Sequence, residues 1–138
     1  MLSNTCKYAL RALIYLGKNA TPEKKIGIKQ LSKDLDISAP FLSKILQTLV
    51  KKDLLISAKG PNGGFALAYL PKDISLWDIV VNIDGESFFD NCLITTENCD
   101  CKLEEDKCCT VHSEYDTVRK NIIDFYKKTN LANVSKNH

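Results

Sequence analysis

A glycine-rich turn between two short apolar segments constrains the fold of this chain more than any other sequence feature. The turn reads Lys59-Gly60-Pro61-Asn62-Gly63-Gly64, and its three glycines, proline and asparagine supply the unusual backbone angles of a tight turn. Residues 54–58 and 65–69 on either side are rich in apolar and β-forming side chains. The pattern predicts a β-hairpin near the middle of the chain.

Three helices are expected before the hairpin. The first is expected over residues 3–18, with Ser3 as N-cap. Its apolar positions recur at helical spacing: Cys6, Ala9, Leu10, Leu13, Ile14 and Gly17. A polar loop over residues 21–27 precedes a short second helix marked by Ile28, Leu31 and Leu35, and Ser38 is expected to cap a third helix that has Pro40 in its first turn. Three helices followed by a hairpin is the element order of a winged helix-turn-helix.

The third helix has the pattern of a helix that reads DNA. One side forms an apolar stripe and the other is small, polar and basic; the stripe holds Leu42, Ile45, Leu46, Leu49 and Val50, and the polar side holds Ser43, Lys44, Gln47, Thr48 and Lys51. Such a free face suits a major groove, although an ordinary solvated helix has the same binary pattern. The candidate DNA-binding residues are Ser38, Ser43, Lys44, Gln47, Lys59 and Asn62.

Charge is distributed unevenly along the chain. Residues 1–60 carry eleven Lys/Arg against four Asp/Glu, whereas residues 61–138 carry eight against thirteen. The basic half suits a polyanion such as DNA, and a solvated lysine-rich surface is the alternative. No signal peptide and no apolar run of about 20 residues is visible, so we expect a cytoplasmic protein without a membrane partner. Cytoplasmic thiols stay reduced, which favours metal binding or redox sensing over structural disulfides.

The chain after the hairpin is expected to form two more helices around an irregular acidic segment. Ser75 is expected to cap a fourth helix that ends at Asp84-Gly85, and the last helix is expected over residues 110–128. Apolar positions in the last helix alternate spacings of four and three: Val111, Tyr115, Val118, Ile122 and Phe125. This coiled-coil seam favours pairing of two subunits, with packing against the first helix as the alternative. Residues 130–138 are expected to be a polar tail.

Five of the six cysteines fall within residues 92–109, and a histidine follows three residues later. The set is Cys92, Cys99, Cys101, Cys108, Cys109 and His112. Soft ligands packed so closely suggest a metal or an iron–sulfur cluster. Zinc is less favoured because the close pairs lack Cys-x2-Cys spacing, and a thiol–disulfide redox switch is the other alternative. The sixth cysteine, Cys6, either contributes a ligand or is a buried small apolar residue.

Four stretches together resemble the IscR/NsrR-type family of bacterial winged-helix transcription regulators. They are residues 7–12, residues 41–46, the turn over residues 59–65, and the segment from Asp84-Gly85 through His112. The resemblance covers nearly the whole chain in the family's order. It implies a homodimer that binds a palindromic operator in double-stranded DNA and holds an iron–sulfur cluster.

The resemblance also implies a ligand set. Cys92, Cys99 and Cys109 match the family's three cysteine positions, and His112 matches a histidine that is the fourth ligand in one branch. Cys101 and Cys108 are possible alternates. A [2Fe–2S] cluster is favoured over a [4Fe–4S] cluster.

These expectations combine into one hypothesis. The fold is mainly α: a winged helix-turn-helix with a two-stranded wing and a long C-terminal dimerisation helix. Residues 1–71 are expected to form the DNA-binding domain, and residues 72–138 the cluster-binding loop and dimerisation helix. The function is expected to be DNA-binding transcription regulation controlled by a cluster that senses redox state, nitric oxide or iron supply. A cluster-free thiol-redox regulator and a protein-interaction adaptor are the alternatives. No catalytic arrangement of residues is recognisable, so an enzyme is not expected.

Overall fold

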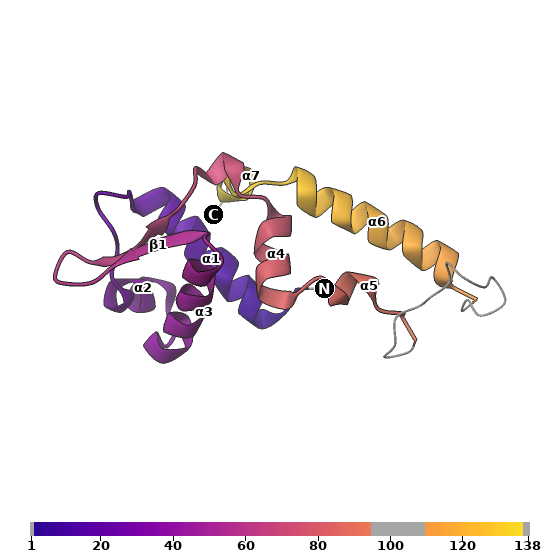
Figure 1. Ribbon diagram of the computed structural model, residues 1–138, viewed down its shortest axis with the longest axis horizontal. Helices are drawn as coiled ribbons and strands as arrows, with labels where there is room; N and C mark the ends of the chain where they lie inside the picture. Colours follow the sequence, from indigo (N-terminus) through magenta and orange to yellow (C-terminus); the bar gives the residue numbers. More distant parts are fainter. Residues whose placement is uncertain (1, 95–109, 137–138) are drawn as a thin grey trace.

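The computed structural model describes residues 2–94 and 110–136 of the 138-residue chain. The elements run α1 (Asn4–Asn19), α2 (Ile28–Leu35), α3 (Ala39–Lys51), β1 (Leu55–Ala58), β2 (Gly64–Leu67), the 3₁₀ turn η1 (Pro71–Asp73), α4 (Leu76–Asp84), α5 (Ser87–Asp90), α6 (His112–Lys128) and α7 (Leu131–Ser135). Figure 1 shows α1–α4 and the hairpin gathered into one body, from which α6 extends to one side. The predicted fold class, mainly helical with a two-stranded wing, is confirmed.

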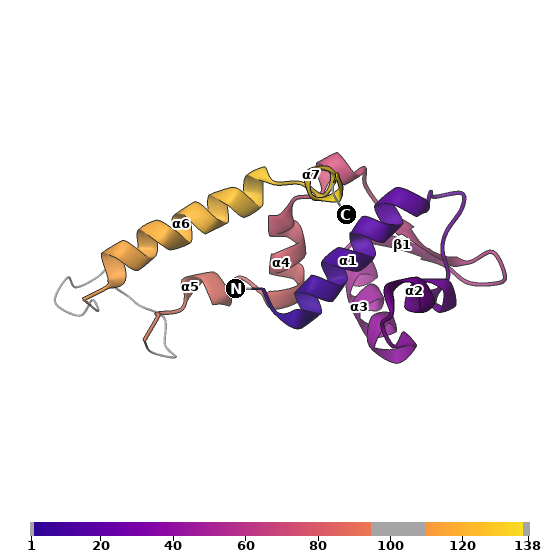
Figure 2. The same ribbon diagram turned by 180° about the vertical axis from the view of Figure 1, so that it is seen from behind.

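The core of the body is built around α1. Figures 1 and 2 show this helix lying between α3 and α4 when viewed from both sides. Ala9 and Ala12 are fully buried, and their small side chains let neighbouring helices approach closely. The three N-terminal helices contribute six large side chains that are almost fully buried: Leu13, Leu16, Leu31, Leu42, Leu46 and Leu49. The helical periodicity predicted Leu13, Leu31, Leu42, Leu46 and Leu49 in this core, whereas Ala12 and Leu16 were not on the predicted apolar face.

The turn between α2 and α3 is held by backbone geometry rather than by the expected cap. Asp36 ends α2 with a left-handed φ of 53°, and Ile37 is buried below it. Ser38 does occupy the N-cap position of α3, but its side chain makes no capping hydrogen bond. The expectation that the Ser38 hydroxyl caps α3 was therefore wrong, because the Pro40 imide lacks one of the donors that a cap would satisfy.

The wing contains a contact that the sequence pattern did not predict. β1 and β2 pair antiparallel, with Leu55 opposite Leu67 and Ala58 opposite Gly64. Ile26, expected in a polar loop, is buried and pairs with Phe65 through two backbone hydrogen bonds of 2.8 and 3.0 Å. The segment before α2 therefore attaches the wing to the helical body.

The C-terminal residues form structure where a polar tail was expected. The backbone N–H of Leu76 donates a hydrogen bond of 2.8 Å to the Thr129 carbonyl, and the backbone N–H of Leu131 donates one of 2.8 Å to the Ile74 carbonyl. Asn130 forms a capping box with Asn133 and starts α7, whose Leu131 is fully buried. The prediction was wrong because one buried leucine in a short polar stretch gives no recognisable period.

An aromatic group connects α4, α5 and α6. Phe89 lies 5.0 Å from the ring of Trp77 and 5.9 Å from that of Tyr126, measured between ring centroids. Lys127 lies over the Trp77 ring, with its ammonium nitrogen 5.0 Å from the centroid of that ring. Residues before and after position 71 belong to one hydrophobic cluster, and the division into domains 1–71 and 72–138 stays a prediction.

Candidate DNA-binding surface and candidate cluster site

The predicted DNA-binding residues lie on two elements at the end of the molecule opposite α6 (Figure 1). On α3, Lys44 and Gln47 are exposed and Ser43 is half-buried, whereas the apolar stripe faces the core. Gln47 donates a hydrogen bond of 3.2 Å to the Ser43 hydroxyl, so these two side chains share one face of the helix. The structure thus gives α3 a polar face on which Lys44 and Gln47 are open to solvent.

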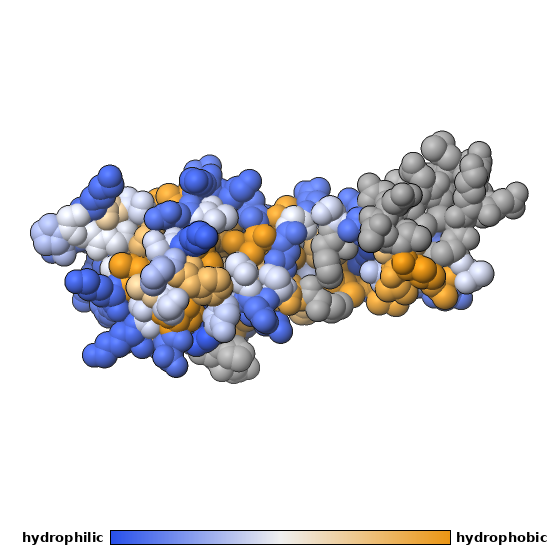
Figure 3. Space-filling model, turned by 90° about the horizontal axis from the view of Figure 1, so that it is seen from below, coloured by the Kyte–Doolittle hydropathy of each residue, from blue (hydrophilic) through white to orange (hydrophobic). Residues whose placement is uncertain are grey.

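The remaining predicted DNA-binding residues flank this face. Ser38 is exposed at the start of α3, and Lys59 and Asn62 are exposed in the turn of the wing. Figure 3 shows hydrophilic side chains gathered at this end of the molecule. Exposed lysines and small polar groups can bind phosphates and base edges, and a wing turn can lie along a backbone or in a minor groove.

Three residues that orient α3 were part of the sequence motif but had no predicted role. Tyr8 on α1 contacts Phe41 on α3 edge to face, with ring centroids 5.5 Å apart. Arg11 on α1 donates to the Leu35 carbonyl at the end of α2 over 2.8 Å, where a cation also complements the helix dipole. Tyr8, Arg11 and Phe41 therefore fix α2 and α3 relative to α1.

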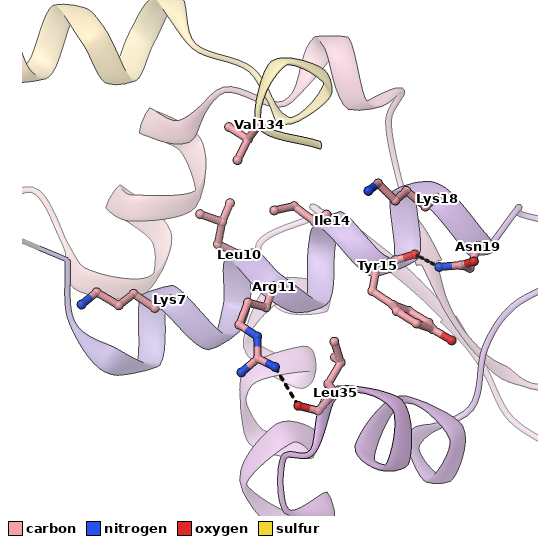
Figure 4. A pocket seen from close by; sticks show the side chains of 9 residues that line it. All are labelled: Lys7, Leu10, Arg11, Ile14, Tyr15, Lys18, Asn19, Leu35 and Val134. Carbon is pink, nitrogen blue, oxygen red and sulfur yellow. Dashed lines mark hydrogen bonds between the residues drawn. The ribbon is translucent and has the colours of Figure 1, made fainter. Parts of the chain in front are cut away.

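An open cavity of about 440 Å³ lies along the outer side of α1. Figure 4 shows it between α1, the end of α2 and α7, with Leu10, Ile14, Leu35 and Val134 as its apolar lining. Lys7, Arg11 and Lys18 stand at its edge. Sequence reasoning could not find this cavity, because Val134 lies in the segment that was taken for a tail.

The candidate cluster ligands are described only in part. Cys92 and His112 are half-buried and lie on opposite sides of the gap in the described residues, Cys92 shortly after α5 and His112 at the first position of α6. Cys99, Cys101, Cys108 and Cys109 lie outside the described residues. Within residues 2–94 and 110–136, no group of three or more His, Cys, Asp and Glu side chains is arranged to hold a metal. The ligand assignment therefore stays a prediction.

Cys6 belongs to the core. Its side chain is only 1% exposed, and burial, together with the charge of Asp84, raises the pKa of the Cys6 thiol to about 12. Asp84 in turn accepts hydrogen bonds from the backbone and hydroxyl of Ser3, which caps α1. A neutral, buried thiol at this position packs as a small apolar residue.

One residue near the cluster segment was missed entirely by sequence reasoning. Arg119 on α6 donates to the carbonyl of Asn91, the residue immediately before Cys92, over 3.3 Å. No local pattern could identify this contact, since its partners are 28 residues apart in sequence.

Comparison with known proteins gives the family. The Rrf2 family, described as iron-dependent transcriptional regulators, matches residues 2–137. An HTH-type transcriptional regulator of Aquifex aeolicus is 34% identical over 142 residues, which cover 100% of this chain and 95% of that protein. The HTH-type transcriptional regulator NsrR of Geobacillus kaustophilus is 38% identical over 79 residues, which cover 57% of this chain and 53% of its own length.

Solved structures show the same fold. CymR, the global cysteine regulator of B. subtilis, superposes with a TM-score of 0.78 at 20% identity and covers 100% of this chain and 98% of its own. IscR of T. potens superposes with a TM-score of 0.73 at 23% identity and covers 99% of this chain and 87% of its own. Among the described residues, no helix is both long and apolar enough to cross a membrane. The chain belongs to the Rrf2 family of winged-helix transcriptional regulators.

Proposed function

We propose that this transcriptional regulator acts as a homodimer on a palindromic operator, and that an iron–sulfur cluster held by the cysteine segment controls its affinity for DNA. The observation that carries the proposal is that one chain contains both a candidate DNA-binding surface and a candidate cluster site. The exposed polar face of α3 lies at one end of the molecule, and Cys92 and His112 lie toward the other end, where α6 begins (Figure 1).

DNA binding is assigned to α3 and the wing. Ser43 and Gln47 are suited to base edges because they lie on the exposed face and can both donate and accept hydrogen bonds. Lys44 and Lys59 are suited to phosphates, since each is an exposed basic side chain. Ser38 and Asn62 flank these groups and complete the proposed contact set.

The DNA assignment is tested with a duplex selected from a random library by the wild-type protein. Lys44→Ala and Lys59→Ala are each expected to weaken binding to all duplexes and to reduce the slope of log affinity against log salt by about 1. Gln47→Ala is expected to relax preference at particular base pairs. Lys128→Ala is the matched control, because Lys128 is a 76% exposed lysine on α6. Equal losses for Lys44→Ala and Lys128→Ala would contradict the assignment.

Cluster binding is assigned to Cys92, Cys99 and Cys109 with His112, and Cys101 and Cys108 are alternates. The donor set fits iron chemically, because thiolates with an occasional histidine are the usual ligands of these clusters. A [2Fe–2S] cluster is favoured, and when bound it supplies a group that reacts with oxidants and nitric oxide. His112 stands at the first position of α6 and is half-buried.

Anaerobic preparation tests the cluster assignment. The wild-type protein is expected to contain iron and inorganic sulfide and to absorb visible light, and Cys92→Ala is expected to lose both. Cys6→Ala is the matched control and is expected to keep the chromophore, since Cys6 lies in the core. A wild-type protein free of iron and sulfide that still binds DNA would favour the cluster-free thiol-redox alternative. Absence of salt-sensitive binding to any duplex would favour a protein-interaction adaptor.

Dimerisation is assigned to the exposed side of α6. Val111, Val118 and Phe125 recur every seven residues and are 38%, 53% and 57% exposed. A repeat of seven with apolar side chains is the pattern by which two helices pair. Pairing of two copies there would hold two reading helices at a fixed separation, which a cluster beside the start of α6 could alter.

A further inference from the structure

Arg119 is buried in a way that the other basic residues of α6 are not. Its side chain is 14% exposed, whereas the side chains of Lys120 and Lys128 are 74% and 76% exposed. One guanidinium nitrogen, Nη2, lies 2.8 Å from Oδ1 of Asp116. The guanidinium carbon lies 5.5 Å from the centroid of the Tyr115 ring. The Asp116 carboxylate thus pairs with this cation, and the Tyr115 ring lies against it.

The second guanidinium nitrogen reaches a different segment of the chain. Nη1 of Arg119 donates to the carbonyl of Asn91 over 3.3 Å, and Asn91 immediately precedes Cys92. The contact ties the segment that leaves α5 to the side of α6. An ordinary helical ion pair has no such second partner: Lys128 and Asp124 meet over 2.8 Å with both side chains largely in solvent.

Arg119 and His112 lie on the same side of α6. Residues seven apart on an α-helix differ by about 20° in direction and by about 10 Å along the axis. Every residue on this side between the start and the end of the helix is at least half-buried: His112, Tyr115, Asp116, Arg119, Ile122, Ile123 and Tyr126. The guanidinium therefore holds the backbone beside Cys92 on the side of α6 on which His112 begins the helix.

The chemistry of the guanidinium suits it to this task. Its planar fork can donate to a carboxylate and to a carbonyl at once, in directions that a lysine ammonium on a flexible stem does not fix. Asp116 stays ionised down to acidic pH, because hydrogen bonds from Arg119 and Lys120 lower its pKa to about 2. The ion pair is therefore intact over the whole range in which the protein is expected to work.

We propose that Arg119 is a positioning residue that holds the backbone at Asn91 against α6 and thereby sets the position of the Cys92 thiol relative to His112. The role of Cys92 and His112 as cluster ligands rests on the proposed function above. The contact between Arg119 and Asn91 does not, and it acts on Cys92 whatever the thiol binds.

The test compares Arg119→Gln, Arg119→Lys and Lys120→Gln with the wild-type protein. Lys120 also pairs with Asp116, over 2.7 Å, but its side chain is 74% exposed, so the Lys120→Gln variant controls for loss of charge near that carboxylate. In the metal-free protein, hydrogen exchange at residues 91–94 and iodoacetamide labelling of Cys92 are followed by peptide mass spectrometry. In the anaerobically prepared protein, the visible spectrum and its half-life in the presence of an iron chelator are recorded.

Arg119→Gln is expected to speed exchange and Cys92 labelling about fivefold to tenfold, the factor that corresponds to the net contribution of one ordinary hydrogen bond. It is also expected to shorten the half-life of the chromophore, with partial recovery in Arg119→Lys and no change in Lys120→Gln. Unchanged exchange and labelling in a folded Arg119→Gln protein would overturn the proposal. A wild-type protein without iron would defeat the proposed function alone, because the metal-free measurements would still decide the role of Arg119.

Discussion

Gly64 shows how a single residue determines the position of the wing. Its φ is +140°, and a Cβ at this position would lie 2.3 Å from the carbonyl oxygen of Ile26. The next residue, Phe65, makes both backbone hydrogen bonds to Ile26. Only a residue without a side chain allows the strand to approach this closely while adopting this backbone conformation.

Gly64→Ala is therefore expected to lower the free energy of unfolding by about 1–3 kcal/mol, since the new methyl group forces the backbone of Ile26 or Gly64 to move. Gly27→Ala is the matched control, because a Cβ there has no atom within 4 Å. Urea denaturation followed by circular dichroism measures both. Equal destabilisation of the two variants would show that the approach of Gly64 to Ile26 is not what restricts this position.

Cys6 gives a prediction that depends on pH. Its pKa rises from 9.0 to about 12 in the folded protein, so folding favours the neutral thiol. The contribution of this group to stability is full below pH 9, where both states are protonated, and is lost as pH rises from 9 toward 12. We expect the free energy of unfolding to fall over that range, and to fall less in Cys6→Ala. Urea titrations between pH 8 and about 11 measure the difference; parallel curves would show that Cys6 is not held neutral.

At the scale of elements, the short helix α7 anchors the end of α6 to the body. Backbone hydrogen bonds join Thr129 and Leu131 to the segment between η1 and α4, and Leu131 inserts beside Gly17 of α1. Gly17 also lies against Leu67 of β2, where a Cβ would stand 3.3 Å from the Leu67 side chain. Gly17 is thus the point on α1 at which Leu131, just after α6, and Leu67 of the wing both make contact.

Leu131→Ala is expected to destabilise the protein by about 2–5 kcal/mol, because it leaves a cavity at a fully buried position. Lys136→Ala, at an exposed position of the same segment, is expected to change stability by no more than about 0.5 kcal/mol. Thermal unfolding measures both. If Leu131→Ala unfolds at the wild-type temperature, α7 contributes nothing to holding α6 on the body.

At the scale of the whole molecule, α6 has two apolar sides with different roles. The side bearing Tyr126 faces α4 and α5, and the side bearing Val118 and Phe125 faces solvent. The residues of the predicted coiled-coil seam are therefore divided between the exposed side and the half-buried side of α6. Val111, Val118 and Phe125 are exposed, while Tyr115 and Ile122 are half-buried. The exposed members are the ones available to a second copy of the chain.

Val118→Lys is expected to weaken dimerisation at least about tenfold, because it places an unpaired charge in the middle of the proposed interface. Thr117→Lys adds the same charge at an exposed position that points about 100° away from Val118 around the helix, and is expected to leave the oligomeric state unchanged. Analytical ultracentrifugation over a range of concentrations distinguishes the two. Identical sedimentation of wild type and Val118→Lys would place the interface elsewhere.

Local sequence patterns were sufficient for α1–α4 and α6, for the wing and for the division of α3 into two faces, but not for α5 and α7. The period of Leu42, Ile45 and Leu49 is a property of neighbouring residues, and the turn at Gly63 and Gly64 follows from their own backbone freedom. The resemblance built on these stretches is confirmed by the family match over residues 2–137. The ligand residues Cys99 and Cys109 stay predictions, as they lie outside the described residues.

The sequence by itself determined that α1–α4, α6 and the wing form, because periodicity, caps and turn residues act over a few positions along the chain. The tertiary structure alone decided how distant segments meet: Ile26 against Phe65, Leu131 beneath α1, and Arg119 on the carbonyl of Asn91. Each of these contacts joins segments that are far apart in sequence, and its geometry depends on how the elements that carry the two segments pack together. No local pattern encodes that packing, which is why the residue that holds Cys92 against α6 could be found only in the folded chain.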